Sequence, residues 1–238
     1  MSPPKNPVIP NRLLAALPRK YYRGLERHLE EIPLIFEAIL YQPSMAITDV
    51  YFPNSGIVSL LAAINDHATL EVGLVGNEGM LGLAVFMGVN TSQNRAVVQG
   101  AGSAMRMKAA RFSRECNNGS ELQRLLQRYS HSMLTQITQS AVCNQFHTVE
   151  ARLARWLLMT HDRMGQDQFQ LTQKFLSNML GVRREGVTRA AGSLQRQKLI
   201  VYSRGRLQVL DRAGLEATSC GCYQIIKSES EAASQPKK

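Results

Sequence analysis

Five polar side chains gather on the exposed face at the start of a predicted helix over 183–197: Arg183, Arg184, Glu185, Thr188 and Arg189. Arginine can donate a pair of hydrogen bonds to guanine, and glutamate can accept one from cytosine. The dipole of a helix disfavours cations at this end, so a merely solvated surface does not explain why arginines gather there. The arrangement indicates that these side chains contact base edges in a DNA groove.

A tight turn between two helices would position this face. Thr172 begins a short helix that extends to about Leu180, and Gly181 follows it, because glycine adopts the left-handed backbone that such a turn requires. The helix faces that must pack together carry small or apolar residues: Leu176, Ser177, Leu180, Val182, Val187 and Ala190. The spacing predicts a helix-turn-helix. Two packed helices of a domain that does not bind DNA would show the same spacing, so that alternative stays open.

Further polar residues flank the two helices where a DNA backbone would pass. Thr172, Gln173 and Lys174 open the first helix, where backbone amides and a lysine suit phosphate. Apolar segments on both sides of 203–206 predict a β-hairpin with Arg204 and Arg206 at its tip, as in a winged helix-turn-helix.

The distribution of charge along the chain agrees with DNA as the partner. Residues 147–215 carry 12 Lys and Arg against 5 Asp and Glu, whereas residues 1–146 carry 13 against 10. A small basic unit attached to a nearly neutral larger one favours a polyanion as its partner. A solubilising surface is the alternative.

The region before these helices has the pattern of a β-structure. Residues 30–112 contain five short apolar segments separated by turn signals, which predicts an antiparallel barrel or sandwich: 47–52, 56–64, 69–75, 96–98 and 104–107. Ahead of them, Leu13–Leu40 has helical patterning interrupted by Pro18 and Pro33. We expect two or three short helices there.

A long helix separates the two regions. Ser120 can cap a helix that continues without Gly or Pro to about Gln145. Its apolar residues step by four, three and four, the alternation of a coiled-coil seam: Leu122, Leu126, Tyr129 and Met133. The length of the helix favours dimerisation through this seam. Packing of the seam on its own barrel is the alternative.

Several classes of protein are excluded or disfavoured by the sequence. The longest apolar stretches fall far short of the ~20 residues of a membrane-spanning helix, and prolines occupy the place of a signal peptide's apolar run. We therefore expect a cytoplasmic protein with free thiols and no membrane partner. The chain has no Gly-x-x-x-x-Gly-Lys loop, nucleophile elbow or His-Glu-x-x-His motif, so no enzyme and no catalytic residue is predicted.

Residues 171–189 resemble the helix-turn-helix of the Crp–Fnr family of bacterial transcription regulators, and the resemblance covers almost the whole chain. It implies an α+β fold with an N-terminal antiparallel β-roll (a cyclic-nucleotide-binding-like sensor domain, 1–118), a dimerisation helix (119–146), a C-terminal winged helix-turn-helix (147–222) and a polar tail (223–238). The family's base-contacting motif Arg-Glu-x-x-x-Arg falls on Arg184, Glu185 and Arg189. Arg183 replaces the family's usual small capping residue, and we assign it to a DNA phosphate. The tail is polar, and we expect it to be mobile.

The sensor region departs from the family pattern. Cyclic-nucleotide binders have Gly-Glu before an apolar segment and Arg-Ser or Arg-Thr after it, whereas this chain has Gly82-Leu83 and Arg95-Ala96. Leucine cannot accept hydrogen bonds from a ribose, so we expect no binding of cyclic AMP and predict no cofactor. These four positions are the candidate effector pocket. Glu78 could substitute for the missing glutamate only if the turn is rearranged.

The cysteines do not form a metal motif by themselves. Cys220-Gly221-Cys222 could bind a metal or oxidise, but no second ligand pair is near in the sequence. We interpret both as thiols of the tail and predict no metal site.

The sequence therefore predicts a homodimeric regulator that binds an inverted-repeat operator in double-stranded DNA, with RNA polymerase as a further candidate partner. A ligand-sensing module that acts through protein partners without binding DNA is the alternative. The effector and the operator sequence are not specified by these patterns, nor is the choice between activation and repression.

Overall fold

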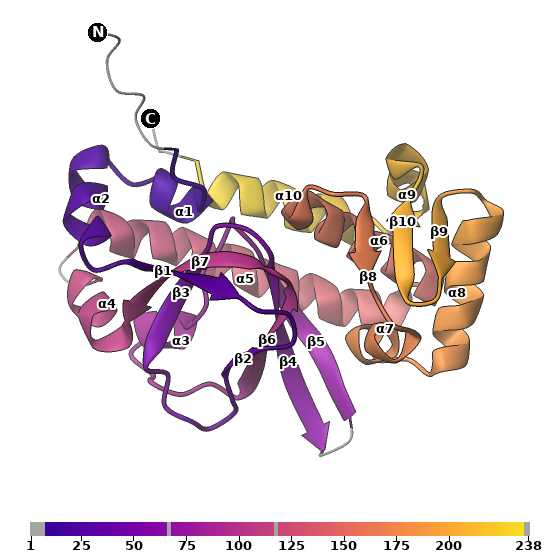
Figure 1. The fold of residues 1–238 in the computed structure, drawn as a ribbon, viewed down its shortest axis with the longest axis horizontal. Coiled ribbons are helices and arrows are strands. Elements are labelled where there is room, and N and C mark those ends of the chain that lie inside the picture. The colour runs from indigo at the N-terminus through magenta and orange to yellow at the C-terminus, as the bar shows by residue number, and fades with distance from the viewer. Residues whose placement is uncertain (1–7, 66–67, 117–118, 236–238) are drawn as a thin grey trace, which may run out of the picture.

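A computed structural model describes residues 8–65, 68–116 and 119–235. Along the long axis of the molecule, an N-terminal β-roll gives way to a C-terminal helical domain, and one long helix runs beside both (Figure 1). The sequence-based fold class, α+β with a β-roll, a long helix and a winged helix-turn-helix, is confirmed. In the described part of the chain no helix combines the length and apolar character needed to cross a membrane.

The β-roll consists of two antiparallel sheets. The first has the strand order β1-β7-β3 and the second β2-β6-β4-β5. Their bounds are β1 Glu30–Leu34, β2 Ile39–Tyr41, β3 Asp49–Pro53, β4 Ile57–Asn65, β5 Ala68–Val75, β6 Asn94–Gly100 and β7 Gly102–Lys108. All five predicted apolar segments are strands. Apolar side chains from both sheets bury one another and form the first core cluster.

The N-terminal segment is only partly helical. Helices α1 (Arg12–Ala15) and α2 (Arg19–Glu26) are present as expected, but the chain beyond them forms β1 and β2. The expectation of helices up to residue 40 is wrong there. Pro33 lies in β1, which among the described strands pairs only with β7 and is an edge strand, the position in a sheet where proline is tolerated.

The long helix α5 spans Glu121–Phe146, after the short helices α3 (Leu83–Phe86) and α4 (Ala109–Glu115). Ser120 is its N-cap, and the hydroxyl oxygen accepts a hydrogen bond from the amide of Gln123 at 3.1 Å. The start and the end of the predicted helix are therefore right within one residue.

The predicted dimer seam faces inward. Leu122, Leu126, Tyr129 and Met133 are all buried in the core of their own β-roll, and the Tyr129 hydroxyl donates to the carbonyl of Met80 at 3.0 Å. Their assignment to a dimer interface is thus wrong, because these side chains fill the space between α5 and the sheets. The alternative interpretation, packing on the chain's own barrel, holds.

The C-terminal domain consists of helices around a small sheet. Its elements are α6 Val149–Met164, β8 Gln168–Gln170, α7 Gln173–Leu180, α8 Arg184–Arg196, β9 Ile200–Ser203, β10 Arg206–Val209, α9 Arg212–Thr218 and α10 Cys222–Ala233. The predicted hairpin is β9–β10. Strand β8 joins it on the other side of β10 and was not predicted.

The C-terminal segment is not a mobile tail. Residues 222–233 form α10, which lies along α5 and buries Tyr223 and Ile226 (Figure 1). Polar contacts add to this packing, because Arg128 donates to the carbonyl of Ala233 at 3.4 Å and His131 lies 3.3 Å from a carboxylate oxygen of Glu229. The tail prediction failed because the apolar residues of this helix are few and find their partners only in the folded chain. Residues 236–238 lie outside the described part.

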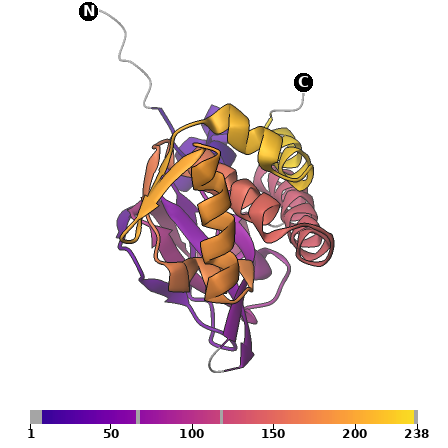
Figure 2. The ribbon, with the colours of Figure 1, turned by 90° about the vertical axis from the view of Figure 1, so that its right-hand side faces the viewer.

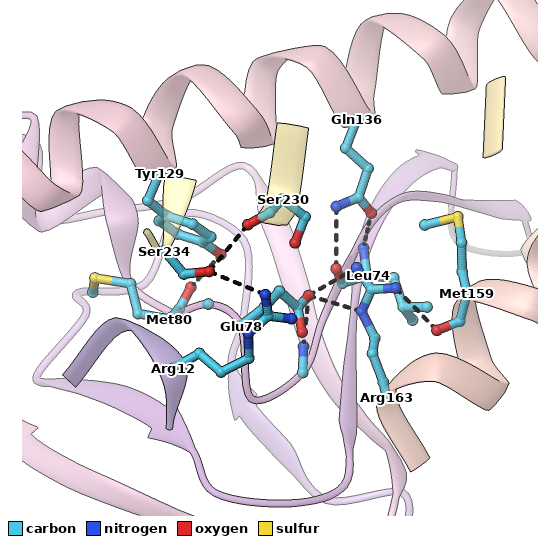
Figure 3. Close-up of polar contacts among 12 residues, drawn as sticks. Arg12, Leu74, Glu78, Met80, Tyr129, Gln136, Met159, Arg163, Ser230 and Ser234 are labelled. Atoms are coloured by element: carbon cyan, nitrogen blue, oxygen red, sulfur yellow. Dashed lines mark hydrogen bonds and ion pairs between the residues drawn. The ribbon is translucent and has the colours of Figure 1, made fainter. Parts of the chain in front are cut away.

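Polar contacts connect the β-roll with the helices that cover it (Figure 3). Arg163 of α6 forms a buried ion pair with Glu78 at 2.7 Å. Gln136 of α5 accepts a hydrogen bond from the amide of Leu74 at 2.7 Å and donates one to its carbonyl at 3.2 Å. These contacts hold α5 and α6 in place against the sheets.

Candidate nucleic-acid interface

The turn between α7 and α8 has the geometry that the sequence predicts. Thr172 is the N-cap of α7, and its side chain accepts a hydrogen bond from the amide of Phe175 at 3.1 Å. Gly181 ends the helix with a left-handed backbone, φ 61°. The left-handed backbone favours glycine there, and a Cβ would also lie 2.7 Å from the Cδ1 of Leu70, whose side chain would have to shift.

The inner faces of the two helices pack as expected. The side chains of Leu176, Leu180, Val187 and Ala190 are buried, Ser177 is buried where the helices approach, and Val182 is partly buried. Leu153 and Trp156 of α6 belong to the same core cluster. This packing leaves only the opposite face of α8 available to a partner.

That opposite face presents the predicted base-contacting residues to solvent. Arg184, Glu185, Thr188 and Arg189 are all exposed. Of the ion pairs within the described residues, none involves these charged side chains. The Thr188 hydroxyl donates to the carbonyl of Arg184 at 3.0 Å. Figure 2 shows α8 at the end of the molecule, beside strands β9 and β10, which form the wing.

Arg183 takes the N-cap position of α8 without acting as a cap. Its backbone is extended, with φ −67° and ψ 153°, and its side chain makes no capping hydrogen bond. The exposed guanidinium is thus not engaged by the helix that it precedes. Arg183 lies next to Arg184 at the end of α8 that has the positive dipole, where an anion would be stabilised.

The predicted backbone contacts lie at the start of α7 and at the tip of the β9–β10 hairpin. Thr172, Gln173 and Lys174 are exposed at the start of α7. The β9–β10 hairpin turns through Arg204 and Gly205, both with positive φ (49° and 76°), which is the geometry of a two-residue type I′ turn. Arg204 and Arg206 are exposed at this tip. The structure therefore brings both sets of residues to the surface around α8.

Sequence and structure comparisons agree with this geometry. The profile of the Crp-like helix-turn-helix domain matches residues 151–218. Residues 151–218 are a Crp-like helix-turn-helix domain. The resemblance noted from the sequence is thereby confirmed.

Solved structures show that about four fifths of the chain shares the fold of Crp/Fnr regulators. FixK2 from Bradyrhizobium japonicum is 16% identical with a TM-score of 0.69, covering 81% of this chain and 98% of its own. A Crp/Fnr family transcriptional regulator from Thermus thermophilus is 22% identical, with a TM-score of 0.63 and coverages of 80% and 98%. The c-di-GMP-responsive global regulator CLP from Xanthomonas campestris is 17% identical, with a TM-score of 0.63 and coverages of 82% and 100%. No curated protein sequence matches the chain.

The candidate effector residues lie in the β-roll. Gly82 and Leu83 start α3, and Ala96 is completely buried in β6. Arg95 is adjacent in β6, and its Nε is buried without a hydrogen-bond partner among the described residues. Ala96 and Leu83 both pack in the first core cluster, so apolar side chains occupy much of this region.

Two further observations bear on ligand binding in the β-roll. Glu78, which could have replaced the missing glutamate, is buried in its ion pair with Arg163 and so is not free to bind a ribose. A cavity of about 1100 Å³ lies instead between the β-roll and the wing of the Crp-like domain, and its lining includes Phe36, Gln99 and Arg204. None of the four candidate effector residues lines that cavity.

A buried carboxyl group joins the β-roll to the first helix of the Crp-like domain. Glu71 of β5 accepts hydrogen bonds from the Ser59 hydroxyl at 2.7 Å and from the indole Nε1–H of Trp156 at 2.9 Å. Burial raises the pKa of Glu71 to about 7, despite these hydrogen bonds. The carboxyl group is therefore about half protonated near neutral pH.

Sequence reasoning missed one group of residues with chemical potential. Cys220 and Cys222 were interpreted as tail thiols because no second ligand pair was near in the sequence, but the fold supplies such a pair. In the fold, Cys143 and His147 from the end of α5 lie beside them. The i, i+4 spacing of Cys143 and His147 on a helix was the available signal, because such residues share one helix face.

Proposed function

We propose that the chain is a transcription regulator that binds specific sequences in double-stranded DNA as a homodimer. The observation that carries the proposal is the exposed set Arg184, Glu185 and Arg189 at the N-terminal end of α8, without ion-pair partners in the described part of the chain. The start of a recognition helix is the part that enters the major groove. Arg184 and Arg189 would bind guanines and Glu185 a cytosine, with Thr188 as an additional contact.

Contacts to the DNA backbone would position this helix. In the proposal, Thr172, Gln173 and Lys174 bind phosphates together with the wing arginines Arg204 and Arg206, because the tip of the wing lies beside the start of α7. Arg183 contributes a further phosphate contact. Support comes from their exposure around α8. Phosphate contacts fix the register of a protein on DNA and leave sequence recognition to the base contacts.

The second half of α5 is the proposed dimer interface, in place of the buried seam. Leu134, Ile137 and Val142 are apolar yet 59%, 36% and 37% exposed. Leu134, Ile137 and the exposed Ala141 follow one another at spacings of three and four residues, so they form one stripe of the helix. Two copies related by a two-fold axis would pair these stripes and place their α8 helices in half-sites about one helical turn, ~34 Å, apart.

We further propose that the β-roll is a sensor domain whose cyclic-nucleotide site is degenerate. Leu83 follows Gly82 where a ribose-binding glutamate would stand, and Glu78 is engaged with Arg163. Each ribose hydrogen bond left unmade in a buried pocket costs ~1–3 kcal/mol. We therefore expect calorimetry with cyclic AMP and cyclic GMP to show no binding in the micromolar range. Saturable binding there would contradict the degenerate site but leave DNA binding intact.

Selection of bound duplexes from a random DNA pool tests the central proposal. The full-length chain should enrich inverted repeats with half-sites one helical turn apart, and the double variant Arg184→Ala/Arg189→Ala should enrich none of them. A variant at Arg196, which lies in the last turn of the same helix, is the matched control and should enrich the wild-type sequence. If the wild type enriches no sequence under any condition, the proposal is wrong and action through protein partners is favoured.

A further inference from the structure

Four metal-ligating side chains meet where α5 ends and α10 begins. Cys143 lies in the last turn of α5, and His147 is the C-cap of that helix. Cys220 and Cys222 come from the link between α9 and α10. One ligand atom of each of the four lies within 4.8 Å of all the others. The Sγ atoms of Cys143 and Cys220 are 3.2 Å apart, and the Sγ of Cys222 is 3.7 Å from the Nδ1 of His147.

We propose that Cys143, His147, Cys220 and Cys222 bind one Zn²⁺ ion. With zinc–sulfur bonds of ~2.3 Å and zinc–nitrogen bonds of ~2.0–2.1 Å, the ligand atoms of a tetrahedral site lie about 3.5–3.8 Å apart. The two distances above differ from this range by only a few tenths of an ångström or less. Three thiolates and an imidazole complete the coordination of zinc, so the site has the composition of a structural centre, with no open position for catalysis.

The geometry favours a single ion over the two other fates of clustered cysteines. A disulfide requires sulfur atoms ~2.05 Å apart, and all four cysteines of the chain are free. An iron–sulfur cluster is bound through separate iron atoms, which spreads its ligands further apart than a mononuclear site does. Ligand atoms that all lie within 4.8 Å of one another fit one small cation.

Two buried arginines supply the charge that such a centre needs nearby. Arg152 and Arg155 are 6% and 7% exposed, and neither forms an ion pair with a carboxylate among the described residues. Arg155 lies within electrostatic reach of all three clustered sulfurs, and Arg152 within reach of Cys143 and Cys220. Zinc with three thiolates and a neutral imidazole carries a net charge of −1. An anion of this kind is favourable beside buried guanidinium groups, and for Arg155 it adds to the nearby carboxyl group of Glu71.

Binding requires no oxidant or reductant. Each cysteine releases its proton to solvent, and each sulfur, like the imidazole nitrogen, donates an electron pair to zinc, whose charge stays +2. Cys143, Cys220 and Cys222 are buried in a small cluster of their own, packed against Ala151 of α6. The ion would therefore hold the start of α10 against the junction of α5 and α6, where the long helix passes into the Crp-like domain.

Metal analysis of the full-length chain is the first test. Protein purified without a chelator should contain one zinc per chain. Replacement of zinc by Co²⁺ should give the ligand-field bands of tetrahedral cobalt together with a thiolate-to-cobalt charge-transfer band. Removal of the metal by a chelator should lower the midpoint of thermal unfolding and increase amide exchange in α10. Iron with inorganic sulfide in place of zinc, or no metal in reduced protein, would overturn the proposal.

Cysteine variants with a matched control assign the ligands. Cys143→Ser, Cys220→Ser and Cys222→Ser should each weaken zinc binding by more than the ~10–100-fold that loss of an outer-shell partner causes, and Arg155→Gln should weaken it within that range. Cys116→Ser is the control, because Cys116 is also buried but lies in the β-roll core. Equal zinc content in Cys220→Ser and Cys116→Ser would refute the site. If a variant does not fold, the cobalt spectrum of the wild type still decides, and none of these results depends on DNA binding.

Discussion

Charged residues behave in opposite ways on the exposed face of α8 and where α6 meets the β-roll. On α8, Arg184, Glu185 and Arg189 are exposed and have no ion-pair partner in the described residues. Where α6 meets the β-roll, Glu78 and Arg163 are buried and satisfied by each other. Burying a charge costs several kcal/mol unless it is paired, so the inner pair serves the fold, whereas the outer set has no role in it. Charges that the fold does not use are the ones available to a partner.

The largest effect is expected when glutamate replaces a buried leucine of α5 rather than an exposed one. Leu126→Glu would bury a carboxylate in the β-roll core, where Leu126 is 0% exposed, and should destabilise the fold by at least ~5 kcal/mol. Leu134→Glu changes an exposed residue of the same helix and should lower the midpoint of thermal unfolding only by the part that dimerisation contributes. Calorimetric melting compares the two directly. In sedimentation, Leu134→Glu should shift the protein toward monomers, and an unchanged dimer would move the interface elsewhere.

Replacement of a glutamate by alanine should affect stability differently in the β-roll and on α8. Glu78→Ala leaves the Arg163 guanidinium buried without its partner and should cost ~3–5 kcal/mol in the free energy of unfolding. Glu185→Ala should change that free energy by less than ~0.5 kcal/mol, because its side chain is exposed. Instead it should loosen discrimination between operators. Denaturant titrations measure both, and equal losses of stability would contradict the distinction.

Glu71 predicts a pH dependence of stability. Its pKa in the folded chain is about 7, mainly because of burial, compared with 4.5 when unperturbed. The folded chain therefore holds its proton more tightly than the unfolded chain. The resulting contribution of Glu71 to the free energy of unfolding is fully present below pH ~4.5. It is lost as the pH rises through ~7 and is on the order of 3 kcal/mol in total.

Glu71→Gln tests that dependence, because an amide can keep the hydrogen bond from Trp156 without titrating. The variant should be more stable than the wild type at pH 8, and its unfolding midpoint should vary less between pH 5 and pH 8. If wild type and variant show the same slope with pH, another group is responsible.

The smallest effects are expected for single substitutions of exposed residues, and they distinguish contacts to bases from contacts to the DNA backbone. Arg184→Ala and Arg189→Ala should each cost ~1–3 kcal/mol at the operator and relax specificity at one base pair. Lys174→Ala and Arg206→Ala should weaken all sequences about equally and reduce the salt slope by roughly one. Titration against matched and single-substituted operators at two salt concentrations separates the classes. Uniform losses for Arg184 and Arg189 would make them phosphate contacts.

Elements whose signals are local were predicted well from the sequence. The Ser120 and Thr172 caps, the Gly181 turn and the β9–β10 hairpin each depend on a few neighbouring residues. Strands β1 and β2 and helix α10 were missed because short segments take their structure from the surfaces on which they pack. In α10, isolated apolar residues such as Tyr223 and Ile226 become a buried face only beside α5 and α6.

By itself, the sequence determined the helix-turn-helix and the identity of its exposed face, because helical periodicity separates the residues that pack from those that do not. Only the tertiary structure decided what the seam on α5 touches, since an apolar stripe buries equally well against a second chain or against its own sheets. The tertiary structure alone also brought Cys143 and His147 to Cys220 and Cys222 across more than 70 residues. Side-chain type and local spacing specify an element and its faces, but the partner of each face depends on how the whole chain packs.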